Sequence, residues 1–438
     1  MYSTPRMSET FSREAHVREM LAFEAALARA EARAGIIPPA AAAAIAAACR
    51  ADLFDVATLD REAAVAGTLA IPLVRRLTER VAGEAGQFVH WGATSQDAID
   101  TALVLQLRGG LDLLTGGLLD VGSACASLAE RYRRTPMAGR TLLQQALPIT
   151  FGLKAARWLA LATRQVRRLR ELRGRVLVVQ FGGAAGTLAS LGQEGMRVTE
   201  LLAGELGLAV PTLPWHAERD RIAEVATALG VVAGAMAKIA SDVALLAQTE
   251  VGEVSPVAVT GKGGSSALPQ KRNPVDATMA LAAARLAIGV VPVVLGAMVQ
   301  EHERAVGGWQ AEWEALPNLF RYTSHAIERV HQAVQGLVVD PARLRANLDL
   351  GGGTIMAEAL TMALAPRFGR VAAFHLVRAA CERATALGVS LRQAALDDDQ
   401  IRAALPSDAV DQVFDPAAYL GSTDSFVDRA LEDWRGLA

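Results

Sequence analysis

The sequence is poor in aromatic residues and cysteines and has no excess of charge of either sign. Aromatic residues make up 5% of the 438 residues, and the three cysteines, Cys49, Cys125 and Cys381, lie far apart. Sparse cysteines without metal or redox spacing are typical of a reducing compartment, so we expect a cytoplasmic protein. The formal net charge of −2 argues against a protein that binds nucleic acid or a membrane surface, because such proteins usually carry a basic excess.

The sequence also has little that predicts export or insertion into a membrane. The first residues, MYSTPRMSETF, show no apolar core and no cleavage-like site, so we expect no secretory signal. The most apolar run covers 288–299, which is shorter than the ~20 residues that span a bilayer. We therefore expect neither a membrane nor a nucleic acid among the partners.

Apolar residues, by contrast, are abundant and follow helical spacing. Hydrophobic residues make up 52% of the chain, and Ala, Leu and Val dominate them, which favours helices over strands. An apolar seam at spacings of three and four residues comprises Ile222, Val225, Leu229, Val232, Met236, Ile239, Val243 and Leu246. Such a seam predicts a long helix packed nearly parallel to others. No alternating run of useful length indicates a strand, so the predicted fold class is all-α, with a central bundle of long helices.

Three helical domains are expected, over 1–109, 110–350 and 351–438. In the first, a helix over 13–34 should begin after Ser12 as its N-cap and end at Gly35. The central bundle should contain the seam helix. Because helices this long often need partner subunits to cover them, we expect an oligomer.

The most unusual segment covers 261–276, GKGGSSALPQKRNPVD, between two apolar helical stretches. Hydroxyls followed closely by Lys271 and Arg272 suit a carboxylate-rich substrate and proton transfer beside it. A phosphate-binding loop is disfavoured because Gly263, not Ser or Thr, follows Lys262, and a nucleophile elbow lacks its G-x-S-x-G frame. A purely structural interpretation stays open, in which Asn273 caps the next helix and Pro274 occupies its first position.

The loop GSSALPQKRNP over 264–274 resembles the signature loop of the fumarase/aspartase superfamily, whose members add to or eliminate across a carbon–carbon bond beside a carboxylate. GATSQD over 92–97 and GRTLLQQALP over 139–148 resemble two further site segments of that superfamily. Within it, the segments over 62–74, 90–108 and 300–317 resemble the bacterial cycloisomerases that act on 3-carboxy-cis,cis-muconate. The resemblance implies an isomerase of aromatic catabolism, in the beta-ketoadipate pathway, that closes this tricarboxylate to 4-carboxymuconolactone during protocatechuate breakdown. It also implies a homotetramer with shared active sites, no cofactor and no metal.

The resemblance further implies roles for individual residues. Ser265 carries the proton, with its hydroxyl tuned by Lys271 and by backbone N–H groups, and Lys271 and Asn273 hold the activating carboxylate. Neutral hydrogen bonds to the other carboxylates would come from Thr94, Ser95, Thr141 and Gln144. Arg140 and Arg304 are candidate partners of the trianion, since guanidinium pairs bidentately with carboxylate, but either can equally form a surface ion pair. Thr94–Asp97 can likewise serve only as a capping box of the next helix.

Two other functions stay open. An adenylosuccinate lyase, or another lyase that eliminates from a succinyl compound, is the same-class alternative. The histidines of adenylosuccinate lyase correspond here to Ala63, Leu142 and Gln270, so groups that enzyme needs are missing.

Gln145 also departs from the cycloisomerase pattern, which has His there. A carboxylate, with a reference pKa near ~4, can attack or leave without an acid's help, so Leu142 in the donor position fits lactone chemistry. A non-catalytic structural relative is disfavoured by Ser265 and Lys271.

Overall fold

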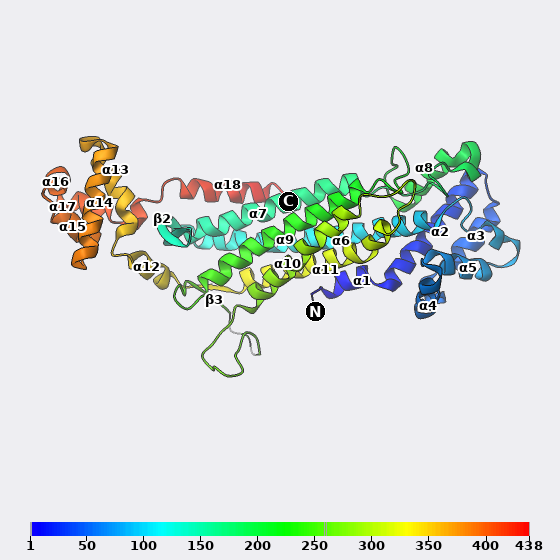
Figure 1. Ribbon diagram of the computed structural model, residues 1–438, viewed down its shortest axis with the longest axis horizontal. Helices are drawn as coiled ribbons and strands as arrows, with labels where there is room; N and C mark the ends of the chain where they lie inside the picture. The colour runs from blue at the N-terminus through cyan, green and yellow to red at the C-terminus, as the bar shows by residue number, and fades with distance from the viewer. Residues whose placement is uncertain (1, 258, 260, 438) are drawn as a thin grey trace. The chain divides into compact units, whose positions relative to one another are not determined.

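The computed structural model describes residues 2–257, 259 and 261–437, and helices dominate it (Figure 1). The shorter helices of the N-terminal region are α1 (Pro5–Thr10), α2 (Arg13–Ala34), α3 (Pro39–Ala48), α4 (Val56–Ala66) and α5 (Ala70–Arg80). The middle of the chain forms α6 (Ser95–Arg131), α7 (Phe151–Val176), α8 (Gly195–Leu206), α9 (Asp220–Leu246), α10 (Val275–Gly296) and α11 (Gly308–Gln335). The C-terminal helices are α12 (Pro341–Asp349), α13 (Ala357–Phe368), α14 (Arg370–Leu387), α15 (Leu391–Leu396), α16 (Asp399–Ala404), α17 (Ser407–Val413) and α18 (Thr423–Arg435). The all-α prediction is confirmed.

The chain divides into two compact units, each built from segments that are distant in the sequence. Unit 1 comprises Met1–Gly117, Gln165–Ala237 and Ala280–Glu328, and unit 2 comprises Leu118–Arg164, Lys238–Met279 and Arg329–Ala438. The division cuts across long helices, so each unit holds part of them. One cluster of buried apolar side chains, which includes Leu360, Val377 and Ile401, lies wholly within 351–438. The three domains expected from the sequence stay a prediction.

The predicted helix over 13–34 is α2, and local chemistry sets both of its ends. The Ser12 hydroxyl accepts a hydrogen bond from the backbone N–H of Ala15, as an N-cap should. Gly35 ends the helix in the left-handed conformation, with φ at 81°, which glycine adopts without steric cost. Both predicted boundaries are confirmed.

The predicted seam helix is α9, and every residue of its seam is buried. The eight seam residues are at most 4% exposed: Ile222, Val225, Leu229, Val232, Met236, Ile239, Val243 and Leu246. The spacing of three and four residues therefore marks the face that packs against the rest of the protein.

The expectation that no segment could span a membrane is wrong as a statement of length and composition. Among the described residues, α6, α9 and α10 are long and apolar enough to cross one. The run over 288–299 looked too short because α10 begins upstream, at Val275, and its alanines extend the apolar stretch. Only 28% of the most apolar window of α10 is buried, against 56% in α6 and 50% in α9. This helix therefore presents an apolar face that its own chain does not cover.

The strands are short and form two antiparallel pairs. β1 (Pro136–Thr141) pairs with β2 (Gln144–Thr150), with a register shift between Ala138 and Arg140, and β3 (Val254–Pro256) pairs with β4 (Leu337–Val339). The β1–β2 hairpin holds one of the three motifs singled out in the sequence. Its strands do not follow a simple alternation of apolar and polar residues, which is why the sequence did not predict them.

Candidate functional site

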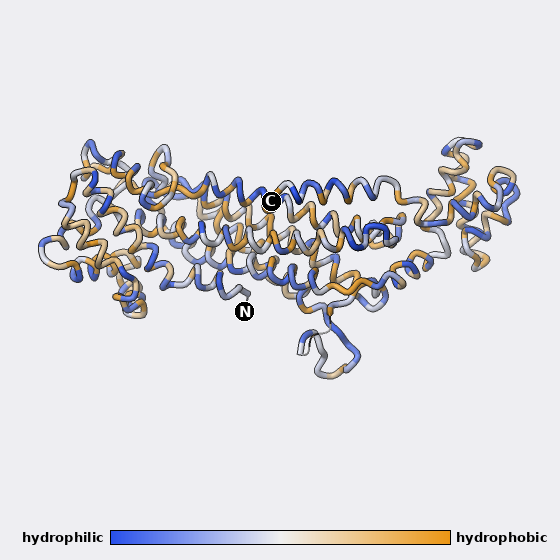
Figure 2. The backbone as a smooth tube through the Cα atoms, turned by 180° about the vertical axis from the view of Figure 1, so that it is seen from behind, coloured by the Kyte–Doolittle hydropathy of each residue, from blue (hydrophilic) through white to orange (hydrophobic). Residues whose placement is uncertain are grey.

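The loop over 261–274 lies between β3 and α10 in unit 2 and is mostly hydrophilic in Figure 2. Within it, the Ser265 hydroxyl oxygen accepts hydrogen bonds from the backbone N–H groups of Ala267, at 3.3 Å, and Leu268, at 3.1 Å. Donors aimed at an oxygen stabilise negative charge on it, as in an oxyanion hole. The backbone thus makes the Ser265 oxygen better able to release its proton.

The same loop lines a cavity of about 340 Å³ in unit 2. Lys262, Lys271 and Arg272 are its cationic lining residues, and Asp276 is its anionic one. Asp276 already pairs with Lys262, at 2.5 Å, and with Arg329, at 3.2 Å. The charges of Lys271 and Arg272 therefore remain to attract a polyanion, since carboxylates pair well with such cations.

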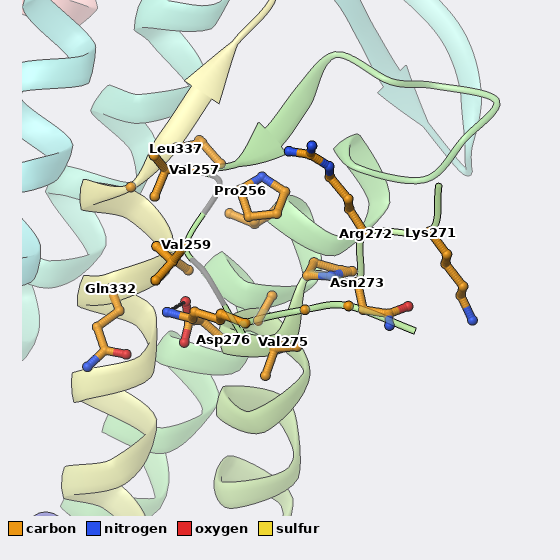
Figure 3. A pocket seen from close by; sticks show the side chains of 18 of the residues that line it. Pro256, Val257, Val259, Lys271, Arg272, Asn273, Val275, Asp276, Gln332 and Leu337 are labelled. Atoms are coloured by element: carbon orange, nitrogen blue, oxygen red, sulfur yellow. Dashed lines mark ion pairs between the residues drawn. The ribbon is translucent and has the colours of Figure 1, made fainter. Parts of the chain in front are cut away.

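Two of the predicted loop residues, Lys271 and Asn273, line this cavity (Figure 3). Figure 3 shows Lys271 and Asp276 on opposite sides of the opening, so the Lys271 ammonium is directed away from that carboxylate. Ser265 is not among the residues that line the cavity. Its hydroxyl oxygen is bonded to two backbone N–H groups of the loop. The expected tuning of Ser265 by Lys271 stays a prediction.

Three further predicted residues, Arg140, Thr141 and Gln144, lie on the β1–β2 hairpin of unit 2. Thr141 and Gln144 are register partners beside the turn, and both are exposed. Arg140 makes a two-pronged ion pair with Glu253, at 2.6 and 2.9 Å, and the Glu253 side chain is fully buried. The structure thus shows an ion pair for Arg140, but with a buried carboxylate and not with the surface partner expected as the alternative, and the charge of Arg140 is compensated within the chain.

The hairpin is held from its second strand as well. Gln145 donates a hydrogen bond from Nε2 to the backbone oxygen of Asn347, at 2.6 Å. Asn347 in turn donates from Nδ2 to Glu253, at 2.8 Å. Gln145 stands where the cycloisomerase pattern has His, and here it helps to fix the stem of the hairpin. Glu253 accepts hydrogen bonds from Arg140 on β1 and from Asn347, whose backbone oxygen is bonded to Gln145 on β2.

Unit 1 holds the Thr94–Asp97 turn at the start of α6. Asp97 is fully buried, and its carboxylate accepts hydrogen bonds from the backbone N–H groups of Thr94, Gly182 and Gly183, at 2.9 to 3.0 Å. The Nε2 atom of His216 lies 2.7 Å from the same carboxylate. The bond to the Thr94 N–H is the return half of a capping box, so the structure shows that half of the capping alternative. The same bond also fixes the backbone of Thr94 and Ser95.

Arg304 lies close to this turn, also in unit 1. Its guanidinium donates to Gln96 Oε1 and to the backbone oxygen of Ala184, both at 3.1 Å. Gln96 uses its amide nitrogen on Asp100 and on the backbone oxygen of His216. Arg304 is therefore positioned by neutral acceptors, and its predicted contact with a substrate carboxylate stays a prediction.

A buried cluster of charges that the sequence analysis missed lies beneath the turn. Arg219 pairs with Asp100, at 2.7 Å, and with Glu312, at 2.5 Å, and all three side chains are fully buried. Burial raises the pKa of Glu312 to about 7 against the pull of Arg219. Trp309 donates from its indole nitrogen to Asp100, at 2.9 Å. Arg219 lies 119 residues from Asp100, so no spacing in the sequence could reveal their contact.

The predicted residues therefore form three groups. The loop contributes Ser265, Lys271 and Asn273, the hairpin contributes Arg140, Thr141 and Gln144, and the turn of unit 1 contributes Thr94 and Ser95 together with Arg304. Over the ranges that the structure describes, no group of three or more His, Cys, Asp or Glu residues is arranged to hold a metal ion. The chemistry available from the described side chains is hydrogen bonding, charge pairing and proton transfer through a hydroxyl.

Comparison with known proteins identifies the family to which this chain belongs. The model of the family described as "Lyase" matches residues 2–289, and that of "Adenylosuccinate lyase C-terminus" matches residues 353–430. The chain is 50% identical over 434 residues to a 3-carboxy-cis,cis-muconate cycloisomerase of Pseudomonas aeruginosa, which covers 98% of this chain and 95% of the relative. It is 42% identical to a nitrosuccinate lyase of Streptomyces davaonensis, over 94% of this chain and 89% of the relative.

A solved structure agrees with these relatives. The crystal structure of the 3-carboxy-cis,cis-muconate lactonizing enzyme from Pseudomonas putida superposes with a TM-score of 0.94 at 45% identity, covering 99% of this chain and 98% of the other. The fold and the extent of the match agree with the family models. This chain therefore belongs to the lyase family of the fumarase/aspartase superfamily.

Proposed function

We propose that this protein is a 3-carboxy-cis,cis-muconate cycloisomerase, which closes its substrate to 4-carboxymuconolactone. The observation that carries the proposal is the 50% identity, over 98% of the chain, to a cycloisomerase of that name. The loop supports it independently, because its Ser265 hydroxyl is bonded to backbone N–H groups and because other residues of the loop, Lys271 and Arg272, line a cavity. The substrate is a small polyanion, which suits these two cations.

The reaction joins two ends of one molecule. An oxygen of one carboxylate attacks a carbon of the conjugated diene, so a C–O bond forms and the electron pair of the C=C bond moves toward the activating carboxylate. The resulting aci-carboxylate carries the extra negative charge until its neighbouring carbon takes a proton. Ser265 gives that proton and regains one from solvent. Lys271 and Asn273 stabilise the charge, the kind of electrostatic stabilisation that dominates many enzymes.

The remaining carboxylates need partners that hold them without taking part in proton transfer. Thr94, Ser95, Thr141 and Gln144 supply neutral hydrogen bonds, and Arg304 supplies a cation. Arg140 acts through the hairpin, because its own charge is paired with Glu253. No ionisable donor is required at the leaving or attacking oxygen, since a carboxylate is a weak base.

We also propose that the active protein is a cytoplasmic homotetramer whose sites combine motifs from different copies. The support is the apolar surface of α10, whose exposed side chains include Leu286, 41% exposed, Ile288, 45% exposed, and Val293, 49% exposed. Exposed apolar side chains gathered on one helix mark an interaction surface, and other copies of the chain cover it here in place of lipid. Light scattering coupled to gel filtration should give four times the chain mass of 46.1 kDa, without detergent. A monomer of full activity would contradict shared sites.

The activity is tested by ultraviolet absorbance with 3-carboxy-cis,cis-muconate. Ring closure shortens the conjugated diene, so the absorbance should fall with enzyme and not with heat-treated enzyme. Adenylosuccinate, argininosuccinate, and fumarate with ammonia serve as parallel substrates, and we expect no turnover of them. Turnover of one of these in place of the muconate would overturn the proposal.

A second candidate is a lyase that eliminates from a succinyl compound. It is favoured by the 42% identity to a nitrosuccinate lyase. Leu142 and Gln270 disfavour it, because they stand where eliminating relatives such as adenylosuccinate lyase carry histidines. Nitrosuccinate belongs in the same assay, and release of nitrite from it would favour this candidate. A protein that turns over none of these substrates would be a non-catalytic relative.

A further inference from the structure

The turn that joins β1 to β2 is made of two leucines in an unfavourable conformation. Thr141 pairs with Gln144, so Leu142 and Leu143 are the two central residues of a two-residue hairpin turn. Their φ angles are 49° and 65°. Positive φ at both central residues is the pattern of a type I′ turn, which strongly prefers Asn followed by Gly. A side chain with a Cβ atom is strained in this region, so neither leucine is there for the sake of the turn.

The same two leucines are also unusually exposed. Leu142 is 96% exposed and Leu143 is 74% exposed. Large apolar side chains on a turn tip add nothing to the core of their own chain. Strain and exposure therefore act against folding at the same two positions, and strained residues that persist in a protein cluster at binding and catalytic sites.

The stem of the hairpin, in contrast, is held firmly. Arg140 on β1 is paired with the buried Glu253, and Gln145 on β2 is bonded to the backbone of Asn347. These anchors lie within one residue of Thr141 and Gln144. The tip therefore projects from a rigid base, with two apolar side chains between two polar ones that are proposed to hold carboxylates.

We propose that Leu142 and Leu143 form the apolar wall of the substrate site and determine which nucleophile reacts. They contact the hydrocarbon chain of the tricarboxylate, while Thr141 and Gln144 contact its carboxylates. This assignment rests on the proposed function and on the proposed assembly, in which other copies of the chain cover the exposed tip.

Their second effect is to exclude water from the carbon that the substrate carboxylate attacks. Water is the competing nucleophile, because its oxygen can bond to that carbon while its proton goes to the neighbouring one, which gives an open-chain hydrated product. A dry wall at this position disfavours that addition and leaves the carboxylate as the nucleophile.

The test is the double variant Leu142→Asn/Leu143→Gly. Asn-Gly fits the turn, so the melting temperature should rise by a few degrees, while kcat/KM for lactonisation should fall at least tenfold and hydrated product should appear. A gain of stability with a loss of activity is a combination that a merely structural role would not produce. The variant Leu142→Met/Leu143→Met keeps the wall apolar, so its reaction should give no hydrated product. Leu387→Asn, at a position 72% exposed on α14, is the matched surface control.

Several outcomes would overturn the assignment. Full activity of the Asn-Gly variant would show that the leucines do not contact substrate. A loss of activity accompanied by a change in oligomeric state would make the tip a contact between copies instead. A melting temperature that falls would contradict the strain on which the argument depends. Wild-type protein is assayed first, because its failure to lactonise would refute the proposed function and not the role of the tip.

Discussion

The turn at Asp97 and the loop at Ser265 handle their polar groups in opposite ways. The Asp97 carboxylate is fully buried, and its partners are three backbone N–H groups and the His216 ring. Ser265 accepts hydrogen bonds from two neighbouring backbone N–H groups, in a stretch whose residues are mostly exposed. A satisfied buried group fixes structure, whereas an accessible hydroxyl stays available for a substrate.

The cations follow the same contrast. Arg219 is fully buried between Asp100 and Glu312, so its charge is neutralised by ion pairs within the protein. Lys271 and Arg272 are exposed and line a cavity, so their charges can serve a ligand. Changes in unit 1 at Arg219 should therefore be seen in stability, and changes in the loop should be seen in catalysis.

The largest effect is expected from Ser265→Ala. Loss of a positioned proton donor should lower kcat roughly 10²–10⁴-fold, with the melting temperature unchanged because the hydroxyl makes only local bonds. Ser266→Ala, at the exposed neighbouring hydroxyl, is the control and should stay close to wild type. A Ser265→Ala protein with full activity would remove the serine from the mechanism.

Arg219→Met should have the largest effect on stability. It leaves Asp100 and Glu312 buried without their cation, which should lower the free energy of unfolding by about 3–5 kcal/mol in a urea titration. Arg175→Met removes an ion pair with Glu224 in which the arginine is 55% exposed, and it should cost less than about 1 kcal/mol. Equal losses in the two variants would contradict the distinction between buried and exposed charges.

Glu31 sharpens the contrast further, because it is a buried acid without the donors that Asp97 has. Neither of its carboxylate oxygens has a hydrogen-bond partner among residues 2–257, 259 and 261–437, and burial raises its pKa from 4.5 to about 9, with a smaller contribution from Glu24. The stabilising contribution of the protonated group is complete below about pH 4.5 and is lost as the pH rises through 9, because the unfolded chain ionises first.

Glu31→Gln mimics the protonated acid and should remove this dependence. We expect the variant to be more stable than wild type at pH 7, on the order of 3 kcal/mol, and equal to it near pH 4.5. Urea titrations between pH 5 and 9 measure the difference, with Glu14→Gln, exposed on the same helix, as the control. Parallel pH profiles of wild type and Glu31→Gln would show that Glu31 is ionised in the folded protein.

No gain at all is expected from Leu142→His, which places the donor of the eliminating relatives at the hairpin tip and removes one side chain of the proposed apolar wall. Lactonisation should not accelerate, because the attacking carboxylate needs no proton from an acid. The measurement is the initial rate of absorbance loss with 3-carboxy-cis,cis-muconate over pH 6 to 8. A large gain would mean that the missing donor limits the reaction.

Local patterns predicted the parts of this protein that depend on neighbours in the sequence. The seam of α9 follows from the helical period, and α2 begins and ends where Ser12 and Gly35 satisfy the helix ends. The loop over 264–274 stands out by composition and resemblance alone. These features need only the few residues around them, which is why they can be read from the chain.

Tertiary contacts decided the rest. The pairing of Arg140 with Glu253 spans 113 residues, and that of Arg219 with Asp100 spans 119, so neither leaves a trace in local spacing. The β1–β2 turn escaped prediction for the opposite reason, since its two leucines contradict the usual turn residues. Residues of suitable chemistry are visible in a sequence. Whether a charged side chain forms an ion pair with a buried partner or stays available for a ligand depends on which distant segments the fold brings together.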